Sequence, residues 1–172
     1  LKGMECNLKD EKGGIDLPLS KLPYLDVVLL GIHPNTPKGL GKEKYTEMML
    51  RAIDSNPSID ILTHLNDKDY SVDFETVISA AKDRGIAIEL NNSKTMLNRV
   101  DPDTTQNLVQ VSLKLGAKMV VTSDMHAIEE LGLDTSVAPY LIESAYPEEL
   151  VISSSAERAM AFIEERRGLK PV

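Results

Sequence analysis

The sequence predicts an α/β fold built on a mostly parallel sheet, and two patterns lead to this prediction. Short apolar runs rich in β-branched residues alternate along the chain with longer stretches in which apolar residues recur at helical spacing. The apolar runs end abruptly in polar residues, which is typical of strands covered on both faces. Alternation of this kind indicates parallel strands joined by right-handed helical crossovers.

Six runs are expected to form strands. In chain order they cover residues 2–8, 27–32, 59–62, 86–90, 119–122 and, most weakly, 150–152. No linker, repeat or change of composition divides the chain of 172 residues, so we expect one domain. A chain of this length buries roughly 70% of its unfolded surface and can therefore form a substantial core.

Four amphipathic patterns lie between these runs and at the end of the chain. Their apolar residues recur at spacings of three and four, within residues 45–53, 74–81, 108–115 and 156–163. The third helix is expected to begin at Asp101 and Pro102, a cap residue followed by a first-turn proline, and to end at Gly116. Ser154 and Glu157 have the spacing of a capping box at the start of the last helix.

Charge and composition disfavour several classes of protein. The chain has 19 Lys and Arg residues against 27 Asp and Glu, a net charge of -8. An acidic surface repels the phosphate backbone, so a nucleic-acid partner is not expected. No apolar run reaches the length of about 18 residues that a membrane span needs. Cys6 is the only cysteine, which excludes an internal disulfide and predicts a reducing, cytoplasmic location.

All three histidines lie at or just after the carboxyl end of a predicted strand. His33 and His64 end the runs at 27–32 and 59–62, and His126 follows the run at 119–122 with Asp124 two residues before it. Ligands bind at this edge of parallel α/β sheets. Neutral imidazole and carboxylate are ligands of zinc, manganese and iron, so the pattern predicts a metal site.

Other residues give weaker signals. Asn91 and Asn92 follow the run at 86–90 and are expected either to donate hydrogen bonds to a substrate phosphate or to cap a loop or helix. Glu89 is a carboxylate inside an apolar run and needs a partner there. No phosphate-binding glycine loop or serine-hydrolase elbow occurs. Four basic residues lie on loops that face either this edge or solvent: Lys38, Lys42, Lys94 and Arg99.

Taken together, five motifs resemble the PHP (polymerase and histidinol phosphatase) superfamily, in particular its bacterial stand-alone phosphatase branch. These motifs are Gly3-Met4-Glu5, Leu30-Gly31-Ile32-His33, Leu62-Thr63-His64, Glu89-Leu90-Asn91-Asn92-Ser93 and Thr122-Ser123-Asp124-Met125-His126. The resemblance covers nearly the whole chain. It implies a PHP-type distorted (β/α)7 TIM-like barrel that holds up to three divalent metal ions and hydrolyses phosphoesters.

The resemblance also implies a role for each matching residue. Glu5 would bridge two metal ions, and His33 and His64 would complete the coordination of one of them. Asp124 would bind the second ion and His126 a third, and both are expected to be catalytic. Zinc is the most strongly expected metal, with manganese and iron as alternatives. A small phosphorylated molecule is the expected substrate, with Asn91 and Asn92 as its binding residues.

The sequence departs from the PHP pattern at its beginning. Family members open with a strand carrying His-x-His, followed by a further His and an Asp-His pair, and none of these occurs here. We therefore expect residues 1–172 to be the C-terminal part of a single PHP domain, an incomplete barrel without its N-terminal strands. Its exposed sheet edges are expected to pair with another copy or with the missing N-terminal segment, and its phosphatase activity is expected to be impaired.

Three hypotheses remain open on the sequence. The first is a metal-dependent phosphoesterase in which a multinuclear metal cluster activates water for phosphomonoester hydrolysis. The second is a non-catalytic metal-binding or interaction module derived from a PHP domain. The third is an α/β binding or regulatory domain with incidental histidines. Metal content separates the third from the others.

Overall fold

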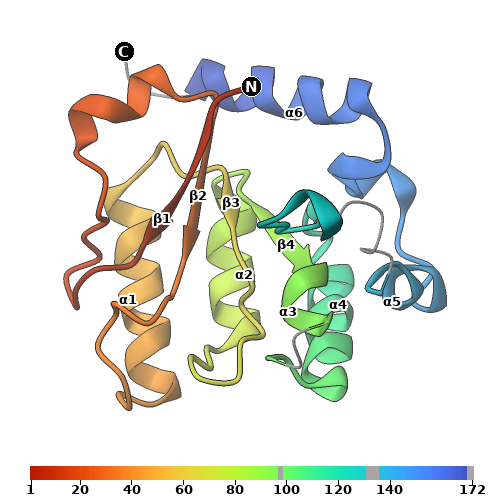
Figure 1. The fold of residues 1–172 in the computed structure, drawn as a ribbon, viewed down its shortest axis with the longest axis horizontal. Coiled ribbons are helices and arrows are strands. Elements are labelled where there is room, and N and C mark those ends of the chain that lie inside the picture. Colours follow the sequence, from red (N-terminus) through yellow and green to blue (C-terminus); the bar gives the residue numbers. More distant parts are fainter. Residues whose placement is uncertain (97–98, 131–135, 170–172) are drawn as a thin grey trace.

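A five-stranded parallel sheet forms the centre of the molecule (Figure 1). This computed structural model describes residues 1–96, 99–130 and 136–169. The strands lie in chain order and are β1 (Gly3–Asn7), β2 (Val27–Gly31), β3 (Ile61–Leu62), β4 (Ala87–Asn91) and β5 (Met119–Thr122). Every neighbouring pair is parallel, so the predicted α/β alternation with a parallel sheet is confirmed.

The four predicted helices are present, and shorter elements accompany them. The α-helices are α1 (Lys42–Ser55), α2 (Phe74–Asp83), α3 (Asn92–Met96), α4 (Pro102–Leu115), α5 (Ala138–Glu143) and α6 (Ala156–Leu169). Four short 3-10 helices are η1 (Leu19–Tyr24), η2 (Ile128–Glu130), η3 (Glu148–Leu150) and η4 (Ile152–Ser154). Asp101 caps α4 as predicted, because its side chain accepts a hydrogen bond from the backbone N–H of Thr104.

Three local predictions differ from the structure, and one of them is the strand expected at 59–62, of which only Ile61–Leu62 forms β3. The run at 150–152 forms no strand beyond one parallel bridge between Val151 and Met119. The N–H of Val151 instead bonds to the carbonyl of Glu148, and this local bond prevents a longer ladder. The side-chain cap of α6 is Ser155 rather than Ser154, because the Ser155 hydroxyl accepts the hydrogen bond from Arg158 N.

The sheet has two differently covered faces. Val28 and Leu30 point toward α1, α2 and α4 and are fully buried in the main core. Val27 and Leu29 point to the opposite face, where they are only partly buried beside Phe162 and Ile163 of α6. Successive strand residues point to opposite faces, so each strand divides its side chains between a helix-covered core and a more open surface.

Helix α6 closes the amino ends of the strands (Figure 1). The Arg166 side chain is buried, and its Nε donates to Asp60 Oδ1 at 3.1 Å. Three further N–H groups of this side chain donate to the backbone carbonyls of Pro57, Ile59 and Arg84. Asp60 Oδ2 accepts in turn from the N–H of Val28 in β2 at 2.8 Å. This ion pair fixes α6 against the sheet at the end opposite the predicted site.

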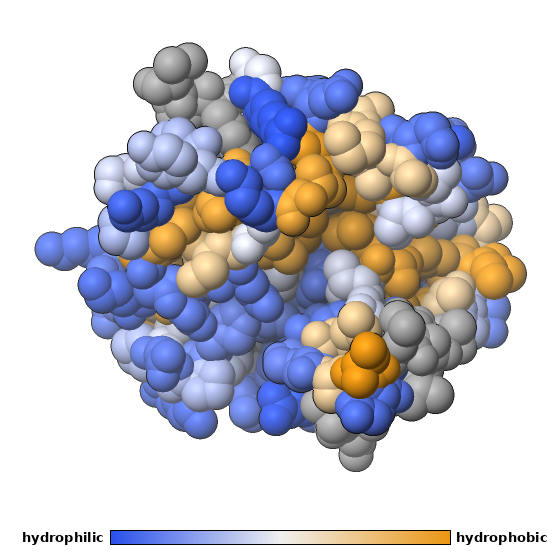
Figure 2. Space-filling model, turned by 45° about the horizontal axis from the view of Figure 1, so that its top comes forward, coloured by the Kyte–Doolittle hydropathy of each residue, from blue (hydrophilic) through white to orange (hydrophobic). Residues whose placement is uncertain are grey.

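The outer edge of β1 has no neighbouring strand among the described residues. Figure 2 shows apolar side chains gathered in a band across the face that it views, between hydrophilic regions. Self-association through such an edge stays a prediction. Among the described helices, none combines the length and the apolar character that crossing a membrane requires.

Candidate metal centre

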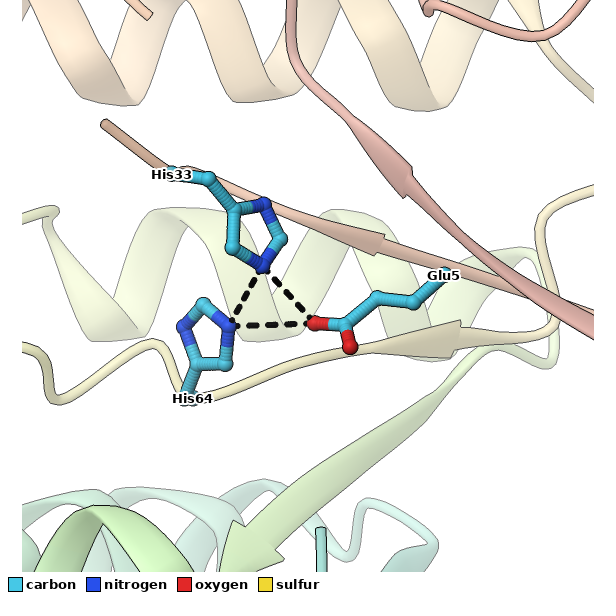
Figure 3. Close-up of side chains that lie close together, drawn as sticks. All are labelled: Glu5, His33 and His64. Atoms are coloured by element: carbon cyan, nitrogen blue, oxygen red, sulfur yellow. Dashed lines mark hydrogen bonds and ion pairs between the residues drawn. The ribbon is translucent and has the colours of Figure 1, made fainter. Parts of the chain in front are cut away.

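Three side chains from three neighbouring strands converge at the carboxyl ends of the sheet (Figure 3). Glu5 lies on β1, and His33 and His64 follow β2 and β3 by two residues each. His33 Nε2 lies 2.9 Å from Glu5 Oε1, His64 Nε2 lies 3.1 Å from the same oxygen, and the two Nε2 atoms are 3.1 Å apart. The structure therefore brings together the three residues that the sequence predicts as ligands of one metal ion.

Gly31 makes room for this convergence. A Cβ atom at this position would lie 2.3 Å from Thr63 Oγ1, 2.6 Å from His33 Cε1 and 3.0 Å from His64 Cε1. The first two separations are below any normal contact and the third is tighter than most, so a side chain at position 31 would displace the Thr63 hydroxyl and the His33 ring and would press on the His64 ring. Gly31 belongs to one of the motifs that carry the family resemblance, but no role was predicted for it; its signal in the sequence is a glycine inside an apolar strand.

The carboxylate of Glu5 is surrounded by side chains that can donate hydrogen bonds to it. Burial disfavours its charged form, but hydrogen bonds and charges from His33 and His64 outweigh burial and lower the pKa of Glu5. The Thr63 hydroxyl donates to Oε1 at 2.9 Å, and no hydrogen bond to Oε2 is recorded within the described ranges. The Glu5 carboxylate is therefore ionised at neutral pH, with one oxygen in the convergent group and one available.

The donor atoms fit a divalent metal ion. Zinc–nitrogen bonds of about 2.0–2.1 Å place tetrahedral ligand atoms roughly 3.3 Å apart, which is close to the separations of 2.9 to 3.1 Å seen here. Imidazole nitrogen and carboxylate oxygen both offer lone pairs to a cation. When no cation is present, two neutral imidazole nitrogens that point at each other can form a hydrogen bond only through one shared proton. The cluster could thus hold one metal ion, and its chemistry suits zinc, manganese or iron alike.

Glu89 connects this cluster to the neighbouring strands. Its carboxylate is almost fully buried and accepts hydrogen bonds from His64 N at 2.9 Å, Thr122 Oγ1 at 2.7 Å and Asn91 Nδ2 at 3.2 Å. Asn91 Nδ2 also lies 3.2 Å from Asp124 Oδ2. Burial raises the pKa of Glu89, while these donors lower it. The predicted need for an inward partner is confirmed, and Glu89 positions the backbone of His64 and, through Asn91, the Asp124 carboxylate.

Asn91 and Asn92 are both buried and bonded within the protein. Asn91 Oδ1 accepts from the backbone N–H of Lys94. Asn92 Nδ2 donates to the carbonyl of Thr122, and its Oδ1 accepts from the N–H of Val137 at 3.1 Å. These contacts hold α3 and the segment before α5 beside β5. Binding of substrate by the two amides stays a prediction.

Asp124 and His126 line the same cavity of about 380 Å³ as the three converging residues. They do not join the convergent group, and the His126 side chain is 76% exposed. His126 Nδ1 lies 2.7 Å from the carbonyl oxygen of Asp124. An Nδ1–H donor to that oxygen leaves the Nε2 lone pair of His126 available to a ligand.

The backbone is strained at two of these positions. His64 has φ of 34° and Asp124 has φ of 49°, values that residues with a Cβ rarely adopt. Each lies just after a strand end, where the chain turns from the sheet into a loop. Such conformations persist where surrounding contacts hold them and cluster at functional sites, and the Glu89 network supplies those contacts here.

Several curated bacterial proteins align with nearly the whole chain. A probable phosphatase of Caldanaerobacter subterraneus is 33% identical over 169 residues, which are 97% of this chain and 66% of the relative. One from Acetivibrio thermocellus is 32% identical over 97% of this chain and 69% of its own length. One from Shewanella halifaxensis is 33% identical over 96% of this chain and 67% of its own length.

The chain belongs to this family of probable phosphatases. It spans about two thirds of the length of these curated relatives. No family model matches the chain. The relatives' names support a phosphatase function, and the convergent Glu and His side chains suggest that metal binding is part of it.

Further residues of this family member face the site without having been predicted to do so. Thr63 holds Glu5, and Glu130 lines the cavity and accepts a hydrogen bond from the backbone N–H of His126 at 2.7 Å. Of the four basic residues named from the sequence, Lys94 and Arg99 line the cavity. In the sequence, the only indication of a role for Thr63 is that it precedes His64, and no local pattern indicates a role for Glu130.

Proposed function

We propose that the chain is a PHP-type metal-dependent phosphoesterase that hydrolyses small phosphomonoesters. The observation that carries this proposal is the convergence of Glu5 Oε1, His33 Nε2 and His64 Nε2 in a cavity that also contains Asp124 and His126. The names of the relatives support the phosphatase part of the proposal. The parallel sheet is consistent with part of a (β/α)7 barrel, which belongs to the proposal as its fold.

In this proposal each ligand has a separate task. Glu5, His33 and His64 would hold one metal ion, Glu5 and Asp124 would contribute to holding a second, and His126 would contribute to holding a third. Zinc is the metal we expect first, followed by manganese and iron. Bound metal ions would generate a nucleophile from water at neutral pH and offset the charge of the phosphate oxygens.

The protein's own groups prepare the site for this chemistry. Thr63 keeps one Glu5 oxygen aimed at the histidines by donating a hydrogen bond to it. Glu89 fixes the backbone of His64 by accepting a hydrogen bond from its N–H. The His64 side chain is only 2% exposed, whereas that of Glu5 is 34% exposed. The cluster therefore has a buried wall and an open side through which a substrate phosphate can enter.

One observation favours the alternative of a non-catalytic metal-binding or interaction module. Asp124 and His126 lie outside the convergent group, and the His126 imidazole points largely into solvent. A single ion held by Glu5, His33 and His64 would leave that module with metal but without the multinuclear centre that the proposed hydrolysis uses. The two proposals differ in whether His126 matters for turnover.

The test combines metal content with hydrolysis. We would purify the chain without a chelating resin, measure zinc, manganese and iron by plasma mass spectrometry, and assay p-nitrophenyl phosphate. We expect at least one metal ion per chain, loss of that ion in the His33→Ala/His64→Ala double variant, and slower hydrolysis with retained first-ion binding in His126→Ala.

Two other outcomes would contradict the proposal. Equal metal content in the wild type and the double variant would mean that the histidines are incidental. Bound metal without hydrolysis in any protein of the series would favour the non-catalytic module. A matched control is His126→Gln, which keeps a polar side chain at the same exposed position without the imidazole lone pair.

A further inference from the structure

A buried lysine in the wall of the metal cavity has an incomplete ion pair. Lys94 belongs to α3 and is only 9% exposed. The ion pair recorded for its Nζ is with Asp67 Oδ2 at 3.7 Å, which is longer than a hydrogen bond. Burying an ammonium group is costly unless an anion compensates it at close range. The Lys94 ammonium is thus placed to accept a further anionic partner.

Arg99 provides a second cation at the same wall. Its N–H donates to the carbonyl of Lys94 at 2.9 Å, and its carbonyl accepts from the N–H of Lys68 at 3.2 Å. These backbone bonds hold the segment near α3 and the loop after β3. The Arg99 residue is exposed, and its guanidinium has no ion pair recorded with any other described residue. An arginine in this state offers a planar pair of donors to a carboxylate or phosphate.

Lys94 and Arg99 stand between two cavities. Both line the metal cavity of about 380 Å³, and both also line a second cavity of about 360 Å³. Pro34 is the third residue shared by the two cavities. Lys68 and Tyr70 belong to the second cavity, and the Tyr70 hydroxyl is buried without a hydrogen-bond partner in the described part of the chain. Asp67 and Asp69 also line the second cavity, which therefore combines three basic side chains, two acidic ones and an unused hydroxyl group.

We propose that Lys94 and Arg99 form a second anion subsite, so that the substrate carries an additional phosphate or carboxylate beyond the phosphate held at the metal centre. This inference rests on the proposed phosphoesterase function and narrows its substrate class. The chain as a whole has a net charge of -8, so general attraction does not favour a more highly charged ligand. Any preference for one has to come from local cations such as these two.

Pairs of ligands that differ by one anionic group test the proposal directly. The zinc-loaded chain would be titrated calorimetrically with phosphoglycolate and ethyl phosphate, and with propane-1,3-diol bisphosphate and propyl phosphate. We expect the second anion to tighten binding by at least about 10-fold, the scale of one charge-assisted hydrogen bond. For each pair we take the ratio of the two dissociation constants, that of the ligand with one anionic group divided by that of the ligand with two. The pair with the larger ratio identifies carboxylate or phosphate as the preferred second group.

Variants then locate the effect. In Arg99→Met and Lys94→Met the ratio of dissociation constants within each pair should fall toward one, because the ligand with the second anion loses more affinity than the ligand without it. Lys38→Met is the matched control, since Lys38 is an exposed lysine on the loop after β2 that lines neither cavity. Because Lys94 is buried, its variant is checked for folding by circular dichroism, and the exposed Arg99 keeps the test valid if Lys94→Met does not fold.

Two results would overturn the inference. A ratio near one in the wild type, with ethyl phosphate still bound, removes the second subsite and leaves the phosphoesterase proposal intact. Absence of binding by all four ligands contradicts the phosphate site itself, and the inference fails with it. A ratio that survives in both variants assigns the preference to other residues.

Discussion

The two ends of the sheet contain charged clusters with opposite designs, one buried and one open on one side. At the amino ends, the Arg166 guanidinium donates to Asp60 and to three backbone carbonyls, and Asp60 accepts from Val28 as well. At the carboxyl ends, a carboxylate oxygen and two imidazole nitrogens point at one another. In the first cluster, donors and acceptors alternate. In the second, three lone-pair donors share one small space.

This difference shows how a fold distinguishes a structural charge from a functional one. A buried ion pair is stable in isolation when each hydrogen finds an acceptor within the protein. A carboxylate and two imidazoles that converge on one point gain further stability when a cation replaces the protons that they otherwise share. The amino-end cluster should therefore matter for folding with or without metal, and the carboxyl-end cluster should matter mainly when metal is present.

The largest effect is expected from breaking the amino-end cluster. Arg166→Met leaves the Asp60 carboxylate buried without its ion pair, which should lower the free energy of unfolding by about 3–5 kcal/mol. Urea denaturation of the metal-free chain measures this loss. In the Asp60→Asn/Arg166→Met double variant the unpaired charge is gone, so its loss should be smaller than that of Arg166→Met alone. Equal losses would mean that packing by Arg166, and not charge pairing, holds α6.

A smaller effect on folding, with a specific effect on metal, is expected at Gly31. Gly31→Ala places a Cβ against Thr63 and both imidazoles, which should cost roughly 1–3 kcal/mol through overpacking and weaken metal binding. Thermal unfolding with and without zinc separates the two effects. A matched control is Gly39→Ala, where a Cβ meets nothing within 4 Å, although its φ of 73° adds backbone strain. Full metal-induced stabilisation in Gly31→Ala would contradict the steric account.

Glu89→Gln tests how far the hydrogen bonds of Glu89 support metal binding by Glu5, His33 and His64. The variant keeps the size of the side chain, but its amide NH2 meets donors where the carboxylate had accepted three hydrogen bonds. We expect metal affinity to fall about 10-fold to 100-fold, as for other groups that orient ligands. Zinc titration by competition with a chromophoric chelator measures the affinity. Unchanged affinity would show that strand geometry alone positions His64.

The sequence was a good guide to the edge of the sheet at which these residues lie. It was a poorer guide to which of them contact one another. Strand-end positions of His33 and His64 followed from the apolar runs before them, because parallel strands all present their carboxyl ends at one edge. Whether a residue at that edge points inward depends on the exact end of each strand and on the loop that follows. Asp124 and His126 show this, since both reach the cavity but lie outside the convergent group.

Residues whose role depends on distant neighbours could not be inferred from local patterns. Gly31 is needed because two side chains from other segments occupy the space beside it. Arg166 finds its partner 106 positions earlier in the chain, and no local pattern encodes such a pairing. The two-residue length of β3 was also missed, because an apolar run of four residues predicts a strand but not how many of its residues form the ladder.

The smallest effect is expected at Cys6, which adjoins Glu5 but lies on the helix-covered face. Burial, followed by the charges of Asp16 and Glu5, raises the pKa of the Cys6 thiol from 9.0 to about 11. A raised acid pKa means that the neutral thiol's contribution to stability is complete below pH 9 and is lost as the pH rises through 11. At pH 10 this loss should be on the order of 1 kcal/mol.

Comparison with Cys6→Ala isolates this contribution from that of every other group that titrates at high pH. The variant loses some packing at all pH values, so its free energy of unfolding should lie below that of the wild type by a constant amount up to about pH 9. Above that pH the two curves should approach each other, since only the wild type has a thiol that ionises in the unfolded chain at a lower pH than in the folded chain. Parallel curves from pH 7 to 10 would mean that Cys6 ionises as freely in the folded chain as in the unfolded one. The two faces of β1 would then differ less in solvent access than the neighbouring Glu5 and Cys6 indicate.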